Sequence, residues 1–481
     1  MSGLLSIEEA QRLVLEHASA LESESVPLEQ AAGRILAEPA RAVVDLPPFA
    51  SSAMDGFAVR AKETPGELRV AEVRAAAGSP AASALQPGEA IAIATGGVVP
   101  EEADAVVPIE AVATTDNSIQ IAGGIAAGEN VRPRGGDARS GDVVVAAGTR
   151  LGPAQLGALA AAGAAEVVCA LRPRAAVIAT GSELRRPGEA LERGQIYEAN
   201  GVMLAAQLES AGAVVASVQV VADDVEAHRR ALEAALECDL VLSSGGVSVG
   251  PHDLVRSVAA DLGAEEIFWR VAVKPGKPLW FGVRGRTLVL GLPGNPVSSL
   301  VGFELFVRPA LLALQGAAEP RPEFAVGALA RPARRNSARD EFVRATRAMR
   351  DDVVDLEPLA GQESHMIARA ALADALVHVP RGDGELPAGT PVAVMGAMVS
   401  MGRTTDPDAA SGERGREARP DRPGPRRAAR QSVLGFAHPG ERAAAHRAAR
   451  RHRLPRRLRS AAIDDARIER HPQVVRHHGH R

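Results

Sequence analysis

Three apolar runs that each end in a glycine-rich loop decide the fold: RAAVIATGSEL (174–184), DLVLSSGGVSVG (239–250) and TLVLGLPGNP (287–296). Helical patterns lie between these runs, and a long one begins at Pro296. Near-continuous apolar strands that alternate with helices are typical of a mainly parallel sheet covered by helices on both faces. Two further strands are expected, VVASVQVV (214–221) and IFWRVAV (267–273).

The sequence on both sides of this α/β region has a different pattern. Residues 26–172 and 317–400 hold short Val- and Ala-rich runs broken by Gly and Pro, which predict short strands and turns. The opening stretch begins with Ser6 and has Glu9 three residues on, a capping box before an amphipathic helix. We therefore predict an α/β domain with β-rich regions on both sides, the second of which is a small barrel or sandwich.

The composition is that of an ordinary globular protein, with 46% hydrophobic and 24% charged residues. At about 150 residues per domain, 481 residues suggest roughly three domains. Two cysteines, Cys169 and Cys238, are too few for a disulfide scaffold and favour a reducing compartment. No uninterrupted apolar run approaches the ~20 residues of a membrane span, and the N-terminus lacks a secretory pattern. We expect a soluble, cytoplasmic protein.

The net charge of −4 is distributed unevenly along the chain. Residues 403–481 hold 20 Arg and 9 Asp or Glu, a net of +11, whereas residues 1–402 have a net of −15. This tail has a single aromatic residue, Phe436, so it cannot bury enough apolar surface to offset its ordering entropy. Two interpretations stay open: a disordered extension that binds nucleic acid, or text from a wrong reading frame of GC-rich DNA.

Lysine is scarce, and its placement is informative. The chain has 52 Arg but only three Lys, and two of these, Lys274 and Lys277, lie in the stretch AVKPGKP (272–278). GC-rich coding favours Arg wherever either cation will serve, so two retained lysines indicate a need for a compact ammonium rather than a planar guanidinium. Chance placement on a surface loop is the alternative.

Four loops at expected strand ends predict a ligand site: TGSELRRPG (180–188), SSGGVSVG (243–250), KPGKP (274–278) and LPGNPVSS (292–299). In open α/β sheets, ligands bind beyond the carboxyl ends of the strands. Glycines let the backbone approach a ligand closely, helix N-termini offer free N–H groups, and the lysines add positive charge. The pattern therefore predicts an anionic ligand, a phosphate or another oxyanion.

Acidic residues lie close to these loops: Glu183, Asp223, Asp224 and Asp253. Carboxylates beside a phosphate site suggest a hard divalent cation such as Mg²⁺. Helix N-capping is the alternative for Asp223 or Asp224. The chain has no CxxC pair and no HExxH motif, so a structural zinc site is not expected.

Three denser segments occur in the first β-rich region: PPFASSAMDGFAV (47–59), IATGGVVPEEADAVVPIE (93–110) and ENVRPRGGDARSGD (129–142). They place carboxylates, hydroxyls and arginines in short loops. Each of them alone is also consistent with a solvated surface loop.

In their order along the chain, these segments resemble the molybdopterin molybdenumtransferases, the family to which the carboxyl-terminal domain of gephyrin belongs. The motifs are SAMDGFAV, TGGVVPEEADAVV, ENVRPRGGD, TGSEL, SSGGVSVGPHD, VKPGKP and LPGNPVSS, and the resemblance covers about residues 5–400. It implies a homodimeric enzyme that transfers molybdate into adenylylated molybdopterin and releases AMP, with Mg²⁺ as cofactor.

The resemblance also implies a discontinuous domain organisation. The parts would be a molybdopterin-binding α/β domain (1–25 plus 173–318), a linking domain (26–44 plus 142–172), a β-rich insertion domain (45–141) and a C-terminal β-barrel (319–400), with the basic tail 403–481 outside them.

Site residues carry over from the family motifs by position. The implied catalytic residues are Asp55, Asp137, Lys274, Lys277 and Asp253. The implied substrate-binding residues are Thr95, Arg132, Thr180, Glu183, Ser244, Gly245, Gly246, Ser248, Pro293, Asn295, Ser298, Arg339 and Ser364. Glu183 and Asp253 are the implied Mg²⁺ ligands. The family brings Asp55 and Asp137 to the cleft across the dimer interface. One departure is His365, which stands beside Ser364 where small residues are common in the family.

Two other functions stay open. Molybdopterin adenylyltransferases resemble the α/β region, but they carry a GGTG loop where this chain has Gly245-Gly246-Val247-Ser248, and they lack the flanking β domains. A non-catalytic scaffold like gephyrin is the second alternative, against which the retained lysines argue. Molybdate and tungstate, both tetrahedral dianions, are alternatives for the oxyanion, and nucleic acid would be a partner of the tail alone.

The scarcity of lysine generates a first prediction. Lys277→Arg keeps the charge, but a forked guanidinium cannot place a compact charge against a tetrahedral oxyanion. We expect molybdate-dependent turnover to fall at least about tenfold, roughly 1.4 kcal/mol in the barrier, with little change in pterin binding. Turnover at saturating pterin, with molybdate varied, measures this, and Lys62→Arg is the matched control. Near-normal turnover in the Lys277 variant would mean that the retained lysine is a coincidence.

Overall fold

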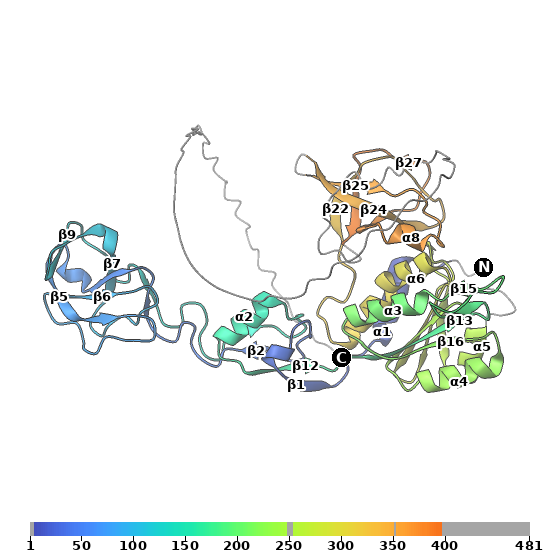
Figure 1. Cartoon of the computed structure of the whole chain (residues 1–481), viewed down its shortest axis with the longest axis horizontal. Helices are drawn as coiled ribbons and strands as arrows, with labels where there is room; N and C mark the ends of the chain where they lie inside the picture. Colours follow the sequence, from blue (N-terminus) through green and yellow to red (C-terminus); the bar gives the residue numbers. More distant parts are fainter. Residues whose placement is uncertain (1–3, 248–253, 351–352, 397–481) are drawn as a thin grey trace, which may run out of the picture. The chain divides into compact units, whose positions relative to one another are not determined.

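The computed structural model describes residues 4–247, 254–350 and 353–396. Its α/β domain contains a six-stranded sheet in the order β16-β13-β17-β21-β20-β18 (Figure 1). The strands are β13 (Arg174–Thr180), β16 (Val214–Val221), β17 (Leu240–Ser244), β18 (Glu265–Trp269), β20 (Trp280–Arg284) and β21 (Thr287–Leu292). β16, β13, β17 and β21 are parallel, and β20 is antiparallel to both of its neighbours. The predicted mainly parallel sheet is confirmed.

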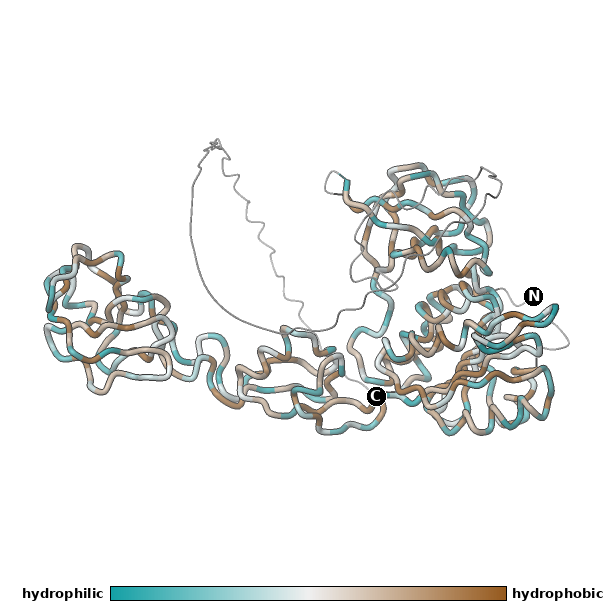
Figure 2. Tube along the Cα trace, in the orientation of Figure 1, coloured by the Kyte–Doolittle hydropathy of each residue, from teal (hydrophilic) through white to brown (hydrophobic). Residues whose placement is uncertain are grey.

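The two faces of this sheet have separate apolar cores, because successive residues of a strand point to opposite faces. Val177, Leu242 and Leu290 belong to one core, and Ile178 and Val241 belong to the other. Helices on the first face are α1 (Ile7–His17), α3 (Asn200–Ser210), α6 (Pro296–Gly302) and α7 (Arg308–Leu314), and those on the second are α4 (Val225–Ala235) and α5 (Leu254–Asp261) (Figure 1). Figure 2 shows hydrophobic residues along the strands between them.

The helix predicted from Pro296 forms, but it contains a π-helical turn, η4 (Phe303–Val307), between α6 and α7. Pro309 has no N–H, so the carbonyl of Leu305 lacks its usual donor four residues on. The side-chain amide of Gln11 on α1 donates to that carbonyl at 2.9 Å. The predicted N-terminal helix, whose capping box is also confirmed, is thereby fixed to the α/β domain.

The combined helix Pro296–Leu314 is the one described helix that is long and apolar enough to cross a membrane. Within the fold, 78% of its most apolar window is buried. It is the core helix of the α/β domain.

The run IFWRVAV (267–273) is not the single strand that its apolar pattern predicted. β18 ends at Trp269, and Arg270 has a φ of +76°, a left-handed conformation that does not continue a strand. The next pairing, β19 (Val273–Lys274), joins a different sheet and runs parallel to β24 (Asp340–Arg350). An apolar run does not reveal where the backbone turns, and for this reason the prediction was wrong.

Two separate segments form a small linking domain with its own core around Leu36 and Leu159. Its paired elements are β1 (Ser23–Pro27) with β12 (Glu166–Ala170) and β2 (Ala40–Arg41) with β11 (Val143–Val145), beside α2 (Pro153–Ala161).

The chain between β2 and β11 forms the insertion domain, a six-stranded sheet in the order β7-β4-β6-β5-β9-β8. Its strands are β4 (Gly56–Val59), β5 (Gly66–Ala75), β6 (Glu89–Ile93), β7 (Ala105–Pro108), β8 (Val112–Thr114) and β9 (Ser118–Ile121).

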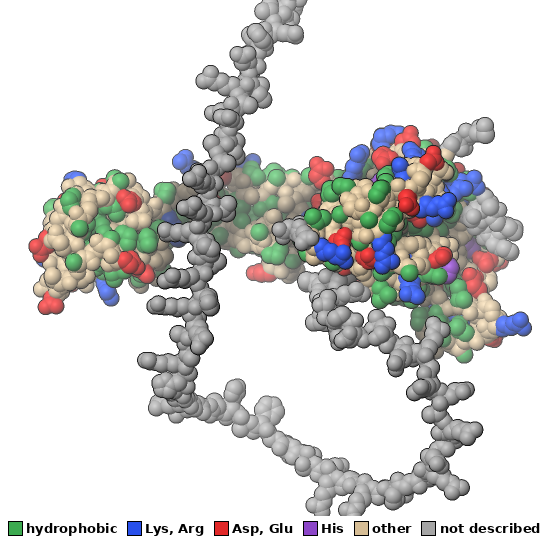
Figure 3. All heavy atoms as spheres, turned by 90° about the horizontal axis from the view of Figure 1, so that it is seen from above, with side chains coloured by type: hydrophobic (Ala, Val, Ile, Leu, Met, Phe, Trp, Pro, Cys, Tyr) green, Lys and Arg blue, Asp and Glu red, His purple; other side chains and the backbone are tan. Residues whose placement is uncertain are grey.

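The C-terminal region is a closed barrel of five strands, because β26 pairs back onto β24. Besides β24, the strands are β22 (Ala325–Leu329), β25 (Val353–Pro358), β26 (Ala375–Val379) and β28 (Pro391–Met395). Of the two predicted arrangements, the barrel is the correct one. Figure 3, seen from above the view of Figure 1, shows Lys and Arg side chains interspersed with Asp and Glu side chains. Ion pairs such as Arg350–Asp355 (3.2 Å) lie on the barrel surface.

Candidate active site

A pocket of about 560 Å³ lies at the carboxyl ends of β13, β17 and β21. The loops that follow these three strands line it, as the strand-end argument predicted. Seven of the predicted residues are among its lining: Thr180, Glu183, Ser244, Gly245, Gly246, Pro293 and Asn295. Ser248 and Asp253, which the resemblance also implied, lie outside the described residues.

Gly245 sets the close approach of two of these loops. Its N–H donates to the carbonyl of Leu292 at 3.0 Å, which joins the loop after β17 to the end of β21. Its φ is +92°, and a Cβ at this position would lie 2.6 Å from Oγ1 of Thr180. Only glycine combines that backbone conformation with that contact, so the sequence SSGG is required by the geometry of the pocket.

Asn200 and Glu198 also line the pocket, and the sequence analysis missed them. The Asn200 amide nitrogen donates to Ser244 Oγ and to the Gly294 carbonyl, each at 2.7 Å. Because a carbonyl can only accept, this contact fixes which end of the amide is nitrogen. Glu198 is 5% exposed, and its Oε1 accepts from the N–H of Gly201 at 2.6 Å. The sequence signal for these two residues was the polar segment YEAN (197–200), which leads into α3, but the helical pattern that begins there drew attention away from it.

The KPGKP loop lies next to this pocket. Pro278 lines the pocket, and the N–H of Val271 donates to the Lys277 carbonyl at 3.1 Å, which closes the loop. The Lys277 residue is exposed, whereas Lys274 is partly buried and its Nζ lies 2.9 Å from Glu341 Oε1 on β24. Both predicted lysines thus stand at the predicted edge, beside the pocket rather than in its lining.

The C-terminal domain brings a second polar group to this edge. The Asn295 amide donates to Ser364 Oγ at 2.9 Å, and the N–H of Val297 donates to the Ser364 carbonyl at 3.0 Å. The neighbouring His365 lines the pocket. Ser298, in contrast, is 3% exposed within α6 and does not line the pocket.

Arg344 shapes the loop that carries Ser364. It is 1% exposed, and its guanidinium donates to the carbonyls of Gly361 (2.7 Å), Glu363 (3.2 Å) and Met366 (2.7 Å). Burial lowers the pKa of this arginine. The motif-implied Arg339 uses its backbone N–H to bind Asn336, and no side-chain contact to a site residue is found for it within the described ranges. Of the arginines in ARDEFVRA, Arg344 is therefore the one that organises the site.

Three of the four predicted acidic residues are described, and they have different roles: two accept hydrogen bonds from backbone N–H groups, and the third lies exposed over a glycine. Asp224 caps α4 by accepting from the N–H of Ala227 at 2.8 Å, so the N-capping alternative is confirmed for it. Asp223 exchanges two hydrogen bonds with Ser182 of the TGSEL loop, at 3.0 and 3.2 Å. Glu183 is exposed, and its carboxylate lies over Gly181, where a Cβ would be 2.5 Å from Oε2. No cluster of three or more metal-ligating side chains is present among the described residues.

The insertion domain gathers its own predicted residues. Asp55 Oδ1 accepts from the backbone N–H (2.7 Å) and the hydroxyl (3.0 Å) of Thr95, and these bonds, the backbone one first, lower the pKa of Asp55. β10 (Val131–Arg132) pairs with β3 (Ser51–Ser52), which places Arg132 opposite Ser51. Asp137 is exposed on the loop that follows. In the described part of the chain, no hydrogen bond, ion pair or pocket joins these residues to the α/β pocket.

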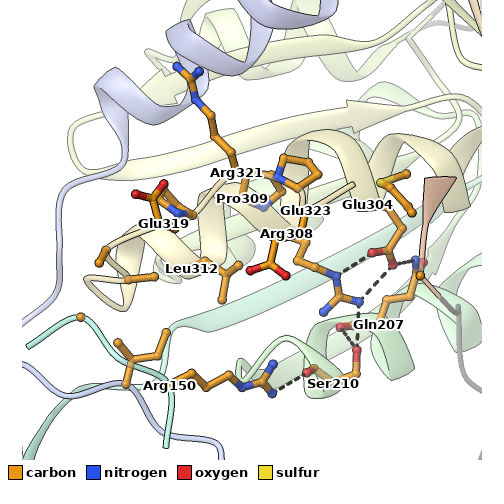
Figure 4. Close-up of a pocket in the computed structure, with 18 of the residues that line it drawn as sticks. Arg150, Gln207, Ser210, Glu304, Arg308, Pro309, Leu312, Glu319, Arg321 and Glu323 are labelled. Atoms are coloured by element: carbon orange, nitrogen blue, oxygen red, sulfur yellow. Dashed lines mark hydrogen bonds and ion pairs between the residues drawn. The ribbon is translucent and has the colours of Figure 1, made fainter. Parts of the chain in front are cut away.

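A larger cavity of about 920 Å³ lies elsewhere and is lined by none of the predicted residues. Several of its polar side chains are hydrogen-bonded within the cavity (Figure 4): Glu304 accepts from Arg308 at 2.6 Å and from Gln207 at 2.8 Å, and Arg150 donates to the backbone carbonyl of Ser210 at 3.3 Å. This cavity is larger than the candidate site, but none of the described residues of the predicted glycine-rich loops and neither predicted lysine lines it.

Family comparisons follow the same division of the chain. The family described as "MoeA N-terminal region (domain I and II)" matches residues 5–163, "Probable molybdopterin binding domain" matches 176–313, and "MoeA C-terminal region (domain IV)" matches 326–396. The second of these contains every residue that lines the α/β pocket except His365. Fold and pocket thus define a protein in which a molybdopterin-binding α/β domain lies between an N-terminal and a C-terminal region that each match a MoeA family.

The similarity to named relatives extends over nearly the full length of each relative. "Molybdopterin molybdenumtransferase 2" of Mycobacterium tuberculosis is 38% identical over 405 residues, which are 81% of this chain and 98% of that protein. The molybdopterin molybdenumtransferase of Staphylococcus aureus strain Mu50 is 32% identical over 399 residues, 81% of this chain and 95% of that protein. The moeA protein of Pyrococcus horikoshii OT3 has a TM-score of 0.70 at 29% identity and covers 82% of this chain and 100% of its own. This chain belongs to the molybdopterin molybdenumtransferase family and is an enzyme of molybdenum cofactor biosynthesis.

The contacts of Arg344 generate a prediction about stability. Arg344→Met removes the guanidinium and leaves partly buried carbonyls of the Ser364 loop without their donors, and an unsatisfied group costs about 1–3 kcal/mol when fully buried. We expect the unfolding free energy to fall by at least about 2 kcal/mol, measured by denaturant unfolding. The control is Arg347→Met on the same strand, whose ion pair with Asp374 (3.7 Å) is exposed and contributes about 0–1 kcal/mol. Equal stability of the two variants would contradict the role given to Arg344.

Proposed function

We propose that this enzyme transfers molybdate into adenylylated molybdopterin, with release of AMP, to form molybdenum cofactor. The observation that carries the proposal is the pocket in which three glycine-rich loops meet, with two lysines and the Ser364 loop beside it. The loops suit the phosphate groups of the pterin substrate, because free backbone N–H groups at a helix start bind anions. The lysines and the Ser364 hydroxyl suit a tetrahedral dianion, which requires compact cations and hydroxyl donors.

Mg²⁺ would be held at the TGSEL loop. Mg²⁺ in phosphate sites usually takes one or two carboxylates together with substrate phosphate oxygens. The exposed carboxylate of Glu183 fits that role, and Asp253 is its proposed partner. When bound, the ion would polarise the phosphoanhydride that links AMP to the pterin.

The chemistry is mainly a matter of positioning. The loops after β13, β17 and β21 would hold the phosphoanhydride, while Lys274 and Lys277 hold molybdate beside the pterin sulfurs. Ligation of the metal by the pterin sulfurs, with loss of molybdate oxygen as water, would be coupled to attack of a water or molybdate oxygen on the pterin-side phosphorus. The bond from that phosphorus to the bridging oxygen would break, and AMP would leave with that oxygen. Fixed donors and restricted motion supply most of the rate enhancement in such phosphoryl chemistry.

AMP release tests this function directly. The purified protein, mixed with adenylylated molybdopterin, Mg²⁺ and molybdate, is expected to release AMP at a rate that depends on molybdate concentration, measured by chromatography. The same protein given unmodified molybdopterin and ATP is expected to release no pyrophosphate. Pyrophosphate release without molybdate-dependent AMP release would instead establish an adenylyltransferase.

We further propose that the enzyme is a homodimer in which the insertion domain of one subunit completes the pocket of the other. Two features support this. The family has that arrangement, and Asp55, Thr95 and Arg132 form a polar group of their own that has no described contact with the α/β pocket. A cytoplasmic location is also proposed, because Cys169 and Cys238 are free buried thiols, as is typical of a reducing compartment.

The shared pocket generates a prediction of complementation. Asp55→Ala and Lys277→Ala are each expected to be inactive as homodimers. After subunits are exchanged between the two, one site in each mixed dimer contains neither substitution, so about a quarter of wild-type activity per chain should return at equal mixing. AMP release before and after exchange measures this, and a mixture of Asp55→Ala with Asp137→Ala, both on the insertion domain, should stay inactive. Exchanged but inactive Asp55/Lys277 mixtures would refute the shared pocket.

A further inference from the structure

The ion pair between Lys274 and Glu341 joins the predicted oxyanion loop to the C-terminal barrel. The two charged atoms are 2.9 Å apart. The Glu341 side chain is 14% exposed and that of Lys274 is 44% exposed. Lys274 is the one ion-pair partner found for Glu341 in the residues that the structure describes. A carboxylate therefore lies against a cation that the proposed function assigns to a dianion.

The backbone dictates this pair. β19 and β24 run parallel, with Lys274 opposite Glu341 and Val273 opposite Asp340. The N–H of Asp340 also donates to the Ala272 carbonyl at 3.0 Å. Residues paired across two strands project their side chains to the same face, so the register itself brings the carboxylate to the ammonium.

The neighbours of Glu341 hold its strand in place. Phe342 is 3% exposed and belongs to the apolar core on the first face of the α/β sheet. Asp340 accepts hydrogen bonds from His378 Nε2 and from the N–H of Arg381, both at 3.1 Å, so its carboxylate is already engaged. Glu341 is thus a partly buried carboxylate on a fixed strand, directed at one lysine.

We propose that Glu341 is a positioning residue that fixes the Lys274 ammonium and limits how tightly the site binds a dianion. The inference rests on the function proposed above. An ammonium has three donors, so one can stay on Glu341 while two bind the oxyanion. The carboxylate lies close enough to repel a dianion held by the same lysine, and this repulsion is little screened at a partly buried site. Molybdate is therefore bound weakly enough to leave the lysine for the pterin sulfurs.

This role predicts opposite changes in binding and turnover. Glu341→Gln keeps an oxygen that can accept from Lys274 but removes the negative charge. We expect the dissociation constant for molybdate to fall at least about fivefold. Turnover at saturating molybdate should fall as well, because the added binding stabilises the intact dianion more than the transition state, in which molybdate is already losing an oxygen as the sulfurs ligate the metal. A residue with a merely structural role would not tighten binding.

Two further variants separate charge from position. Glu341→Asp keeps the charge but is one methylene shorter, so binding should stay within about twofold of wild type while turnover falls, because Lys274 is less well placed. Glu357→Gln is the matched control. It removes a carboxylate from the same barrel, where Glu357 pairs with Arg331 at 2.6 Å, and should change neither quantity.

The measurement is calorimetric titration of the full-length protein with sodium molybdate at constant ionic strength, together with the molybdate dependence of AMP release. Unchanged or weaker binding by Glu341→Gln, beside a wild-type protein that binds molybdate, would overturn the role of Glu341 and leave the proposed function intact. A wild-type protein that neither binds molybdate nor releases AMP would overturn the proposed function, and this inference with it.

Discussion

The side-chain amide of Asn200 holds together the two loops on which the pocket depends. Its nitrogen donates to Ser244 Oγ, at the last residue of β17, and to the carbonyl of Gly294, two residues after the neighbouring parallel strand β21. Ladder hydrogen bonds fix the strands but end where the loops begin. Beyond that point, the amide of Asn200 and the bond from the Gly245 N–H to the Leu292 carbonyl keep the loops side by side. The shape of the proposed phosphate-binding edge thus depends on one buried side chain and one glycine.

Strand β24 of the C-terminal barrel contacts the pocket edge of the α/β domain through side chains on both faces of the strand. Alternate residues of a strand share a face, so Phe342 and Arg344 project to one side and Glu341 to the other. Phe342 enters the apolar core of the α/β domain, Arg344 binds the loop that carries Ser364, and Glu341 binds Lys274. The barrel therefore contributes to the candidate site, and two of the candidate oxyanion groups, Lys274 and the Ser364 loop, contact the same strand.

The sequence predicted the features that depend on periodicity and motif order. The alternation of apolar strands and helices predicted the mainly parallel sheet, and the glycine-rich loops were correctly placed at one edge of it. Tertiary geometry decided the features that the sequence did not predict. Arg270 turns the chain inside an apolar run, and Asn200 stands at the start of an ordinary helical pattern. Arg339 and Arg344 occupy one short motif, and only packing shows that Arg344 is the buried one.

The distribution of cations follows the shape of what each one contacts. Arg344 uses its planar fork to reach three carbonyls of one loop. Arg256 and Arg270 stack on the ring of Trp269, with 3.9 and 3.7 Å from guanidinium carbon to ring centroid. A lysine would fit both arrangements less well, because its compact ammonium has neither a planar fork to match several carbonyls nor a flat face to stack on a ring. Where the expected ligand is tetrahedral, the preference reverses, and a chain with 52 Arg keeps two of its three lysines in one loop. Under the proposed function, the two lysines beside the pocket suit a tetrahedral oxyanion, and the arginines suit carbonyls and a ring face.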